Sequence, residues 1–294
     1  MKNMGIFWVT ASLLAFSVNG AAEVNFSLIN TGQSAGSPES LIFSGGDWLK
    51  SRQLVHNAVL IQHEQGDLLI DTGLGKEVDQ QVSAMGWLNK LLFAYKKAVP
   101  AIDQLTQQNY DFGRLKAIIP THLHWDHASG IEDFKTLNIP VWVQEHELET
   151  AKESKPPAFI QSQFDDPAIN WHFISLNETS ELGFSASLDV FKDGSVILLD
   201  MSGHTHGQLG VLVNNEYLFI GDSTWSVEGV NNNVGRGALT KWFLDLNYDQ
   251  EKSDNLIGNL HRLAKNKPKL VVVPAHDEEV AETLPLYPQF QNDF

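Results

Sequence analysis

The sequence predicts an α/β fold in which β-sheets pack against each other and are covered by helices. Many short runs rich in Val, Ile, Leu and Phe are separated by turn residues, which is typical of strands. Helical patterns are fewer, and this balance favours layered sheets with helices on their outer faces. No repeat, linker or change of composition divides residues 23–294, so we expect one domain there.

The first segment of the chain predicts export. A lysine at position 2 precedes an apolar run over residues 4–18, and small residues follow at 20–22. This three-part pattern is typical of a secretory signal peptide. A membrane anchor is the less favoured alternative, because the run is short for a hydrocarbon core of roughly 30 Å. We therefore expect residues 1–22 to be removed and the mature chain, residues 23–294, to be secreted or periplasmic without a stable membrane span.

The remaining elements are expected in the following order. Strands are predicted at VNFSLI, HNAVLIQH, DLLID, LKAIIP, VWVQ, WHFIS, VILLDM, LGVLVN, YLFIG and KLVVVP. Asn214 and Asn215 between two of these runs predict a tight hairpin. Helices are expected over residues 76–108, with breaks at Gly86 and Pro100, and over residues 249–265, where leucines recur at helical spacing.

Composition narrows the classes of function. The chain has 294 residues, with 20 Lys+Arg against 36 Asp+Glu and a formal net charge of −16. Such a surface repels phosphate backbones, so nucleic acid is not expected as a partner. The chain has no cysteine, which excludes disulfides, thiolate metal sites and a cysteine nucleophile.

Residues 121–130, THLHWDHASG, hold the strongest chemical pattern. His122 and His124 follow a predicted strand and face the same way, because alternate residues of an extended chain do so. Asp126 and His127 come just beyond, where a turn can present further ligands. Nitrogen and carboxylate donors without thiolate suit zinc, with manganese or iron as alternatives. Four such residues within six positions favour a metal site over unrelated structural histidines.

The pattern H-x-H-x-D-H resembles the signature of the metallo-β-lactamase superfamily. Four further motifs are present, and together the five occur in that family's order. LLIDTG at 68–73 ends a strand at Asp71, and SGHTHG at 202–207 contains His204. LFIGDSTW at 218–225 contains Asp222, and VVVPAHD at 271–277 contains His276. The resemblance covers essentially the whole mature chain and is closest in layout to the lactonase-like dinuclear zinc members.

The resemblance implies a four-layer αββα sandwich with two Zn²⁺ ions, or Mn²⁺ or Fe²⁺ in their place. It implies that one ion is held by His122, His124 and His204, the other by Asp126, His127 and His276, and that Asp222 bridges both. Asp126 is also expected to act in catalysis, by orienting the nucleophile and accepting a proton. Asp71 is expected to orient a ligand histidine through a hydrogen bond, or else simply to begin a turn.

The function implied is hydrolysis by a metal-bridging hydroxide that is available near neutral pH. The expected substrate is a small molecule, a lactone or related ester. One alternative is a β-lactam-hydrolysing enzyme, and another is a non-catalytic metal-binding protein on the same scaffold.

Three positions depart from the family pattern. His206 replaces a proline and could reach the pocket, whereas Gln208 replaces a histidine that is mostly structural. Trp225 stands where lactonases often carry a tyrosine, and is expected to wall the pocket instead. The remaining histidines lack ligand spacing and are expected to be surface or structural residues: His56, His63, His146, His172 and His261.

Two further features allow two interpretations each. Residues 87–97, WLNKLLFAYKK, predict a buried helix that covers the sheet, or else an apolar lid or homodimer surface. Arg236 and Lys241 either bind a carboxylate of the substrate or are solvated loop charges.

Overall fold

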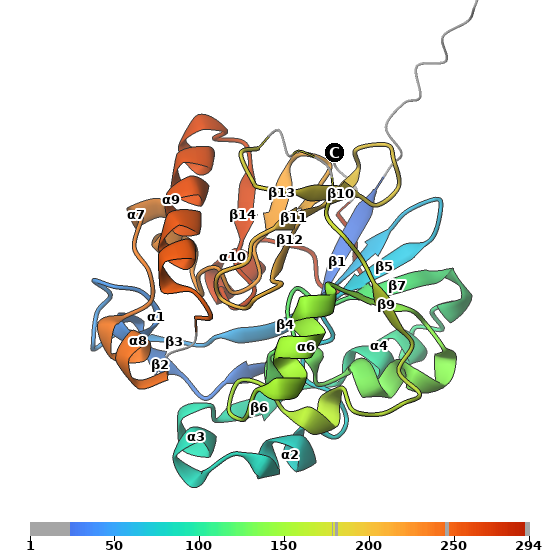
Figure 1. Ribbon diagram of the computed structural model, residues 1–294, viewed down its shortest axis with the longest axis horizontal. Helices are drawn as coiled ribbons and strands as arrows, with labels where there is room; N and C mark the ends of the chain where they lie inside the picture. The colour runs from blue at the N-terminus through green and yellow to red at the C-terminus, as the bar shows by residue number, and fades with distance from the viewer. Residues whose placement is uncertain (1–23, 178, 180–181, 245–246, 292–294) are drawn as a thin grey trace, which may run out of the picture.

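Two β-sheets lie face to face in the computed structural model, with helices on both outer sides (Figure 1). The structure describes residues 24–177, 179, 182–244 and 247–291, so the predicted signal peptide, residues 1–22, lies outside the described residues. Within the described residues, no helix has the length and hydrophobicity needed to cross a membrane.

The first sheet has the strand order β6-β1-β4-β5-β7-β8-β9. Its strands are β1 (Asn25–Ser34), β4 (Val55–Gln62), β5 (Asp67–Ile70), β6 (Tyr95–Lys97), β7 (Leu115–Ile119), β8 (Val141–Val143) and β9 (Trp171–Phe173). The second sheet has the order β10-β11-β12-β13-β14. Its strands are β10 (Ser187–Asp189), β11 (Val196–Asp200), β12 (Leu209–Val213), β13 (Tyr217–Phe219) and β14 (Val271–Val273). A small separate ribbon pairs β2 (Ser37–Pro38) with β3 (Ser51–Arg52).

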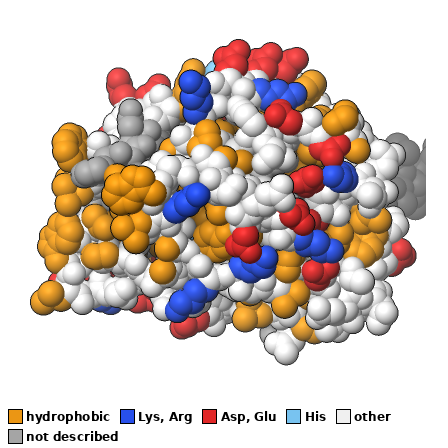
Figure 2. Space-filling view, turned by 90° about the horizontal axis from the view of Figure 1, so that it is seen from below, with side chains coloured by type: hydrophobic (Ala, Val, Ile, Leu, Met, Phe, Trp, Pro, Cys, Tyr) orange, Lys and Arg blue, Asp and Glu red, His pale blue; other side chains and the backbone are white. Residues whose placement is uncertain are grey.

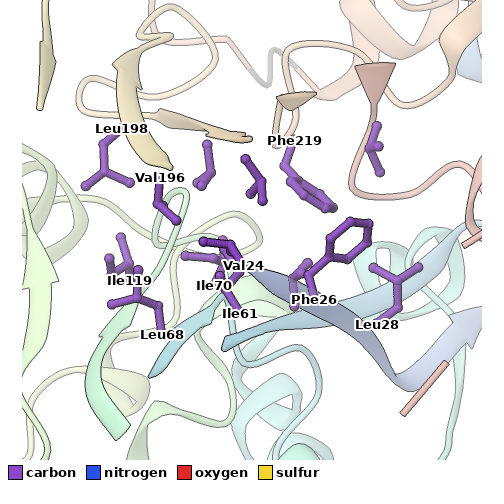
Figure 3. Close-up of a cluster of buried hydrophobic side chains, with 14 of the residues drawn as sticks. Val24, Phe26, Leu28, Ile61, Leu68, Ile70, Ile119, Val196, Leu198 and Phe219 are labelled. Carbon is purple, nitrogen blue, oxygen red and sulfur yellow. The ribbon is translucent and has the colours of Figure 1, made fainter. Parts of the chain in front are cut away.

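The space between the sheets is filled by buried apolar side chains from both of them (Figure 3). Successive side chains of a strand point to opposite faces, so each strand of the first sheet supplies two layers. In β5, Leu68 and Ile70 face the second sheet, whereas Leu69 faces the helices. Phe219 of β13 packs edge-on against Phe26 of β1 across the interface, with ring centroids 5.4 Å apart.

Helices cover the outer face of each sheet and complete the four layers. The α-helices are α1 (Glu39–Ile42), α2 (Val78–Gln81), α3 (Trp87–Leu92), α4 (Ala101–Gln107), α5 (Trp125–Ala128), α6 (Glu145–Glu153), α7 (Val227–Asn232), α8 (Ala238–Leu244), α9 (Gln250–Asn266) and α10 (Glu278–Ala281). Leu105 of α4 and Leu148 of α6 pack on the first sheet. Val230 of α7 and Leu256 of α9 pack on the second. The predicted αββα sandwich is therefore confirmed.

Short 3₁₀ turns join several of these elements: η1 (Val82–Ala84), η2 (Phe112–Arg114), η3 (Ile131–Leu137) and η4 (Gln161–Gln163). Every predicted run forms a strand, and Asn214 and Asn215 adopt positive φ angles of 50° and 57° in the β12–β13 hairpin. Gly86 and Pro100 precede α3 and α4, as the predicted breaks require. The prediction did not include four short strands: β2, β3, β6, which lies between these two helices, and β10.

Candidate metal centre

The candidate centre lies where strands of both sheets end. β7 of the first sheet leads into residues 122–127, the last of which begin α5. Strands β11, β13 and β14 of the second sheet are followed by His204, Asp222 and His276. The structure brings all seven residues predicted as ligands into one cluster, in which every side chain is buried except that of Asp126, which is 12% exposed.

The first group of donors consists of His122, His124 and His204. His204 Nε2 lies 3.0 Å from His124 Nδ1. The Nδ1 atom of His204 lies 3.0 Å from Asn247 Oδ1 and 3.2 Å from Arg236 Nη2, so these two side chains hold the ring with Nε2 turned towards His124. Two buried ring nitrogens at this separation are suited to binding one cation.

The second group consists of Asp126, His127 and His276, with Asp222 between the groups. His276 Nε2 lies 3.4 Å from Asp126 Oδ2 and 3.0 Å from Asp222 Oδ1. His127 Nε2 lies 3.3 Å from the same Asp222 oxygen. The other Asp222 oxygen, Oδ2, lies 3.5 Å from His204 Nε2 of the first group. Asp222 therefore contacts both groups, as a bridging ligand must.

Hydrogen bonds from outside the cluster fix the orientation of the two histidines of the second group, His127 and His276. His127 Nδ1 donates to Asp71 Oδ2 at 2.9 Å, and His276 Nδ1 donates to the Val55 carbonyl at 2.7 Å. Asp71 Oδ1 accepts from the Thr121 N–H at 2.6 Å, which ties the carboxylate to the ligand loop. These contacts point both Nε2 atoms at the cluster. Asp71 thus makes the histidine contact expected of it, at a backbone φ of 55°.

Two buried polar side chains, Glu147 and Gln208, hold the ligand loops together. The sequence pattern points to Gln208 but not to Glu147. Glu147 of α6 accepts from the Leu123 N–H at 2.9 Å and from the Gly207 N–H at 2.7 Å. Gln208 accepts from the Asp222 N–H at 3.1 Å and donates to the Met201 carbonyl at 3.0 Å. Glu147 has no distinctive pattern in the sequence, because an acidic residue on a helix is normally solvated.

The donor set fits divalent metal ions. His122 Nε2 is buried within the cluster without a hydrogen-bond partner among the described residues, which is costly unless another group satisfies it. Two ligands of one tetrahedral zinc ion, with bonds of about 2.0–2.1 Å, lie about 3.3–3.4 Å apart. The donor pairs in both groups lie 3.0–3.5 Å apart, close to this separation.

Comparison with known proteins agrees with this geometry. The sequence model described as "Metallo-beta-lactamase superfamily" matches residues 51–276. The chain belongs to the metallo-beta-lactamase superfamily.

Sequence identity to individual relatives and solved structures is low. The N-acyl homoserine lactonase AttM of Rhizobium radiobacter is 29% identical over 157 residues, a match that covers 52% of this chain and only 57% of that relative. A solved N-acyl homoserine lactone hydrolase, with the product N-hexanoyl-L-homoserine at its catalytic metal centre, has a TM-score of 0.69 at 21% identity over 91% of this chain and 98% of its own. The dizinc quorum-quenching lactonase AidC has a TM-score of 0.60 at 15% identity over 92% and 90%. These structural likenesses show the shared fold.

The departures from the superfamily pattern have local explanations. Trp225 lines the pocket, as expected, and its indole N–H donates to Asp222 Oδ2 at 2.7 Å. His206, whose role the sequence left open, does not line this pocket, and its ring stacks on Tyr248 with centroids 4.5 Å apart. Gln208, through the hydrogen bonds above, has the structural role expected of that position.

The sequence allowed two roles each for Arg236 and Lys241, and neither side chain lies free at the pocket. Arg236 is buried, donates to the Asp222 carbonyl and packs on the Trp225 ring with its Cζ 4.7 Å from the centroid. The structure therefore assigns it to holding the centre rather than to either predicted role. Lys241 forms a partly exposed ion pair with Asp254 at 3.2 Å, consistent with a solvated loop charge.

The two donor groups differ in how readily their histidines hold a proton. Burial lowers the pKa of His124 to about 4 and lowers the pKa values of His122 and His204 well below the ordinary value. Burial also opposes a proton on His127, but the carboxylates of Asp71 and Asp126 raise its pKa well above the ordinary value. In the same way, Asp222 raises the pKa of His276. The metal-free second group therefore retains protons that the first group lacks.

One histidine was misjudged from the sequence. His56 of β4 was expected to be a surface or structural residue, yet it lines the pocket beside Asp126 and His276. Its spacing in the sequence gives no sign of this, because β4 precedes every other donor by many residues. By contrast, His63 is structural, as expected, since it pairs with Asp193 at 2.9 Å and stacks on Phe191.

An apolar rim surrounds the mouth of the pocket. It is formed by Leu41 and Ile42 of α1, Leu54, residues 92–94 at the end of α3, and Thr240 of α8. The prediction that residues 87–97 form a buried helix is wrong, because α3 buries none of its side chains and Trp87 is 79% exposed. Figure 2 shows hydrophobic side chains gathered at the left, on the side where α1, α3 and α8 lie.

Proposed function

We propose that this protein is a dinuclear metal-dependent hydrolase that acts on a lactone or a related ester. The observation that carries the proposal is the pair of buried donor groups joined at Asp222 beneath an apolar pocket. Nitrogen and carboxylate donors without sulfur favour two zinc ions, with manganese or iron as alternatives. The N-acyl homoserine lactonases among the relatives, one of them a dizinc enzyme, give independent support.

The chain's own residues have distinct roles in this proposal. Bound zinc ions would lower the pKa of coordinated water and polarise a substrate carbonyl. Burial opposes charge on Asp126, but the nearby charges of His127 and His276 hold the pKa of its carboxyl below the ordinary value. The ionised carboxylate can therefore accept a hydrogen bond from an attacking water and orient it. Trp225 already donates its N–H to Asp222, so it walls the pocket rather than assisting the carbonyl as a tyrosine would.

The pocket favours a substrate with a compact polar head and an apolar tail. The head would lie at the metal centre, and the tail would lie along Leu41, Leu92 and Phe93. A chain with a net charge of −16 is poorly suited to attract a polyanionic substrate. An N-acyl lactone has the favoured form, whereas a phosphodiester does not.

A substrate panel tests the proposal directly. Purified protein reconstituted with Zn²⁺ should bind close to two ions per chain by elemental analysis. It should open N-acyl homoserine lactones faster than it hydrolyses β-lactams, thioesters or phosphodiesters. The matched control is the same preparation stripped with a chelator, which should be inactive and should recover on adding Zn²⁺. Two bound ions without turnover of any ester or lactone would favour a metal-binding protein, and faster β-lactam cleavage would favour the β-lactamase alternative.

We also infer export, from the sequence pattern of residues 1–22. Mass spectrometry of protein recovered from the periplasm or medium of an expressing bacterium should show a chain shortened by about 22 residues. Retention of Met1 in that soluble material would contradict the inference.

A further inference from the structure

His56 is held at the metal centre by the backbone of β4. The Val55 N–H donates to the His276 carbonyl at 3.2 Å, while His276 Nδ1 donates back to the Val55 carbonyl at 2.7 Å. Thr31 Oγ1 donates to the carbonyl of His56 itself at 2.7 Å. The start of β4 is therefore tied directly to a predicted ligand, and these bonds hold the backbone of His56 beside the centre.

The side chain of His56 has an unsatisfied nitrogen that faces the centre. His56 is 6% exposed, and its Nδ1 atom has no hydrogen-bond partner among the described residues. Asp126 Oδ2 lies 3.2 Å from this nitrogen, but the approach lies outside hydrogen-bond geometry. A buried nitrogen in this state calls for another partner.

The position of this nitrogen matches that of a ligand. His56, Asp126 and His276 form a group whose donor atoms could hold one ion. Asp126 Oδ2 lies 3.2 Å from His56 Nδ1 and 3.4 Å from His276 Nε2. Both separations approach the roughly 3.3–3.4 Å between neighbouring ligands of a tetrahedral zinc ion. Zinc can take five ligands in all, so His56 would complete the set on this ion and coordinated water would belong to the other ion.

We propose that His56 is an additional ligand of the second metal ion, which it shares with Asp126, His127, His276 and Asp222. This inference rests on the proposed dinuclear function. The competing role for His56 is a hydrogen bond to Asp126 with no contact to the metal. The two roles require different chemistry at position 56, because a ligand must offer a lone pair, whereas the competing role requires an N–H donor.

A pair of substitutions separates these roles. His56→Asn keeps an N–H donor at about the reach of Nδ1 but is a poor metal ligand, whereas His56→Asp keeps a good ligand atom and loses the donor. Each stripped variant is titrated calorimetrically with Zn²⁺, and the visible spectrum of its Co²⁺ form is recorded. We expect His56→Asn to weaken binding of the second ion by more than about tenfold and to change the Co²⁺ spectrum. His56→Asp should bind the second ion within a few-fold of the unaltered protein.

The opposite ranking, with His56→Asn near normal and His56→Asp impaired, would overturn the proposal, as would unchanged titrations of both variants. His63→Asn is the matched control, because His63 is also buried but lies outside the centre. It should leave both titrations unchanged, and thermal melting of the stripped proteins reports any general loss of folding. If the unaltered protein bound no second ion, the dinuclear function itself would fail, which is a different result from failure of the His56 variants.

Discussion

The floor and the rim of the pocket are built in opposite ways. The floor consists of buried donors that follow strands of both sheets and are fixed by outer partners such as Asp71, Glu147 and Gln208. The rim is formed largely by short helices and mixes buried side chains, such as Ile42, with side chains that remain partly in solvent, such as Leu92 at 46% exposed. Rigid strand ends suit a reaction that needs fixed geometry, and short surface helices suit variation in what is bound. We therefore expect the floor to determine the chemistry and the rim to determine the choice of substrate.

The largest expected effect comes from removing the bridge in the floor. Asp222→Ala deletes the carboxylate whose two oxygens face the two groups, so both metal ions should be bound more weakly. We expect kcat/KM to fall well beyond the roughly 10–100-fold that follows loss of an outer partner of a ligand. Elemental analysis and steady-state kinetics on the same preparation measure the two effects.

Asp254→Ala is the control for this substitution, since it removes an exposed carboxylate that pairs with Lys241. It should change activity little. Near-normal turnover of Asp222→Ala would show that the bridge assignment is wrong.

The next largest expected effect is the loss of metal ions as the pH is lowered. Raised pKa values mean that His127 and His276 hold protons which a second ion must displace, whereas the first group stays neutral down to about pH 4, the lowered pKa of His124. Proton competition therefore weakens the second ion at higher pH than the first. Dialysis from pH 8 towards pH 5, followed by elemental analysis, should show about two ions falling to about one before the last is lost. Simultaneous loss of both ions would mean that the two groups do not differ in this way.

The smallest effect tests the rim. Phe93 lines the pocket and is only partly buried, so Phe93→Ala should flatten the preference for long acyl chains while short substrates react almost normally. Each buried methylene contributes up to about 0.8 kcal/mol, so the change should amount to several-fold across a few carbons. The melting temperature should fall less than expected for a core phenylalanine, whose loss costs about 3–5 kcal/mol.

Leu91→Ala provides the comparison, because Leu91 is 67% exposed on α3 and does not line the pocket. It should leave the chain-length preference unchanged. A destabilised Phe93→Ala variant with an unaltered preference would exclude a role for the rim in binding the tail. The prediction that this segment forms a homodimer surface is independent of that result.

The same contrast explains what the sequence could predict. Strands are read from local runs, and four donors follow one of them within residues 122–127, so layered sheets and a metal site could be predicted locally. The four-layer order and the donors His204, Asp222 and His276 were predicted from the resemblance to the superfamily. His56 could not be predicted, because a lone histidine on β4 reaches the centre only through pairing with distant His276. The segment at Trp87 was also misassigned, because an apolar run has the same composition whether it covers a sheet or lies in solvent. Arg236 was misjudged for a similar reason, since its burial against Trp225 depends on tertiary packing.

The donors of the centre come from both sheets, and this has a consequence for the stability of the fold. An ion held from both sides joins the two halves of the sandwich as a cross-link, in a protein that has no cysteine with which to form a covalent one. A ligand that binds only the folded state stabilises it by about 4 kcal/mol when its concentration is roughly a thousand times its dissociation constant. We therefore expect the supply of metal, rather than the redox state of the surroundings, to change the free energy of unfolding of this protein.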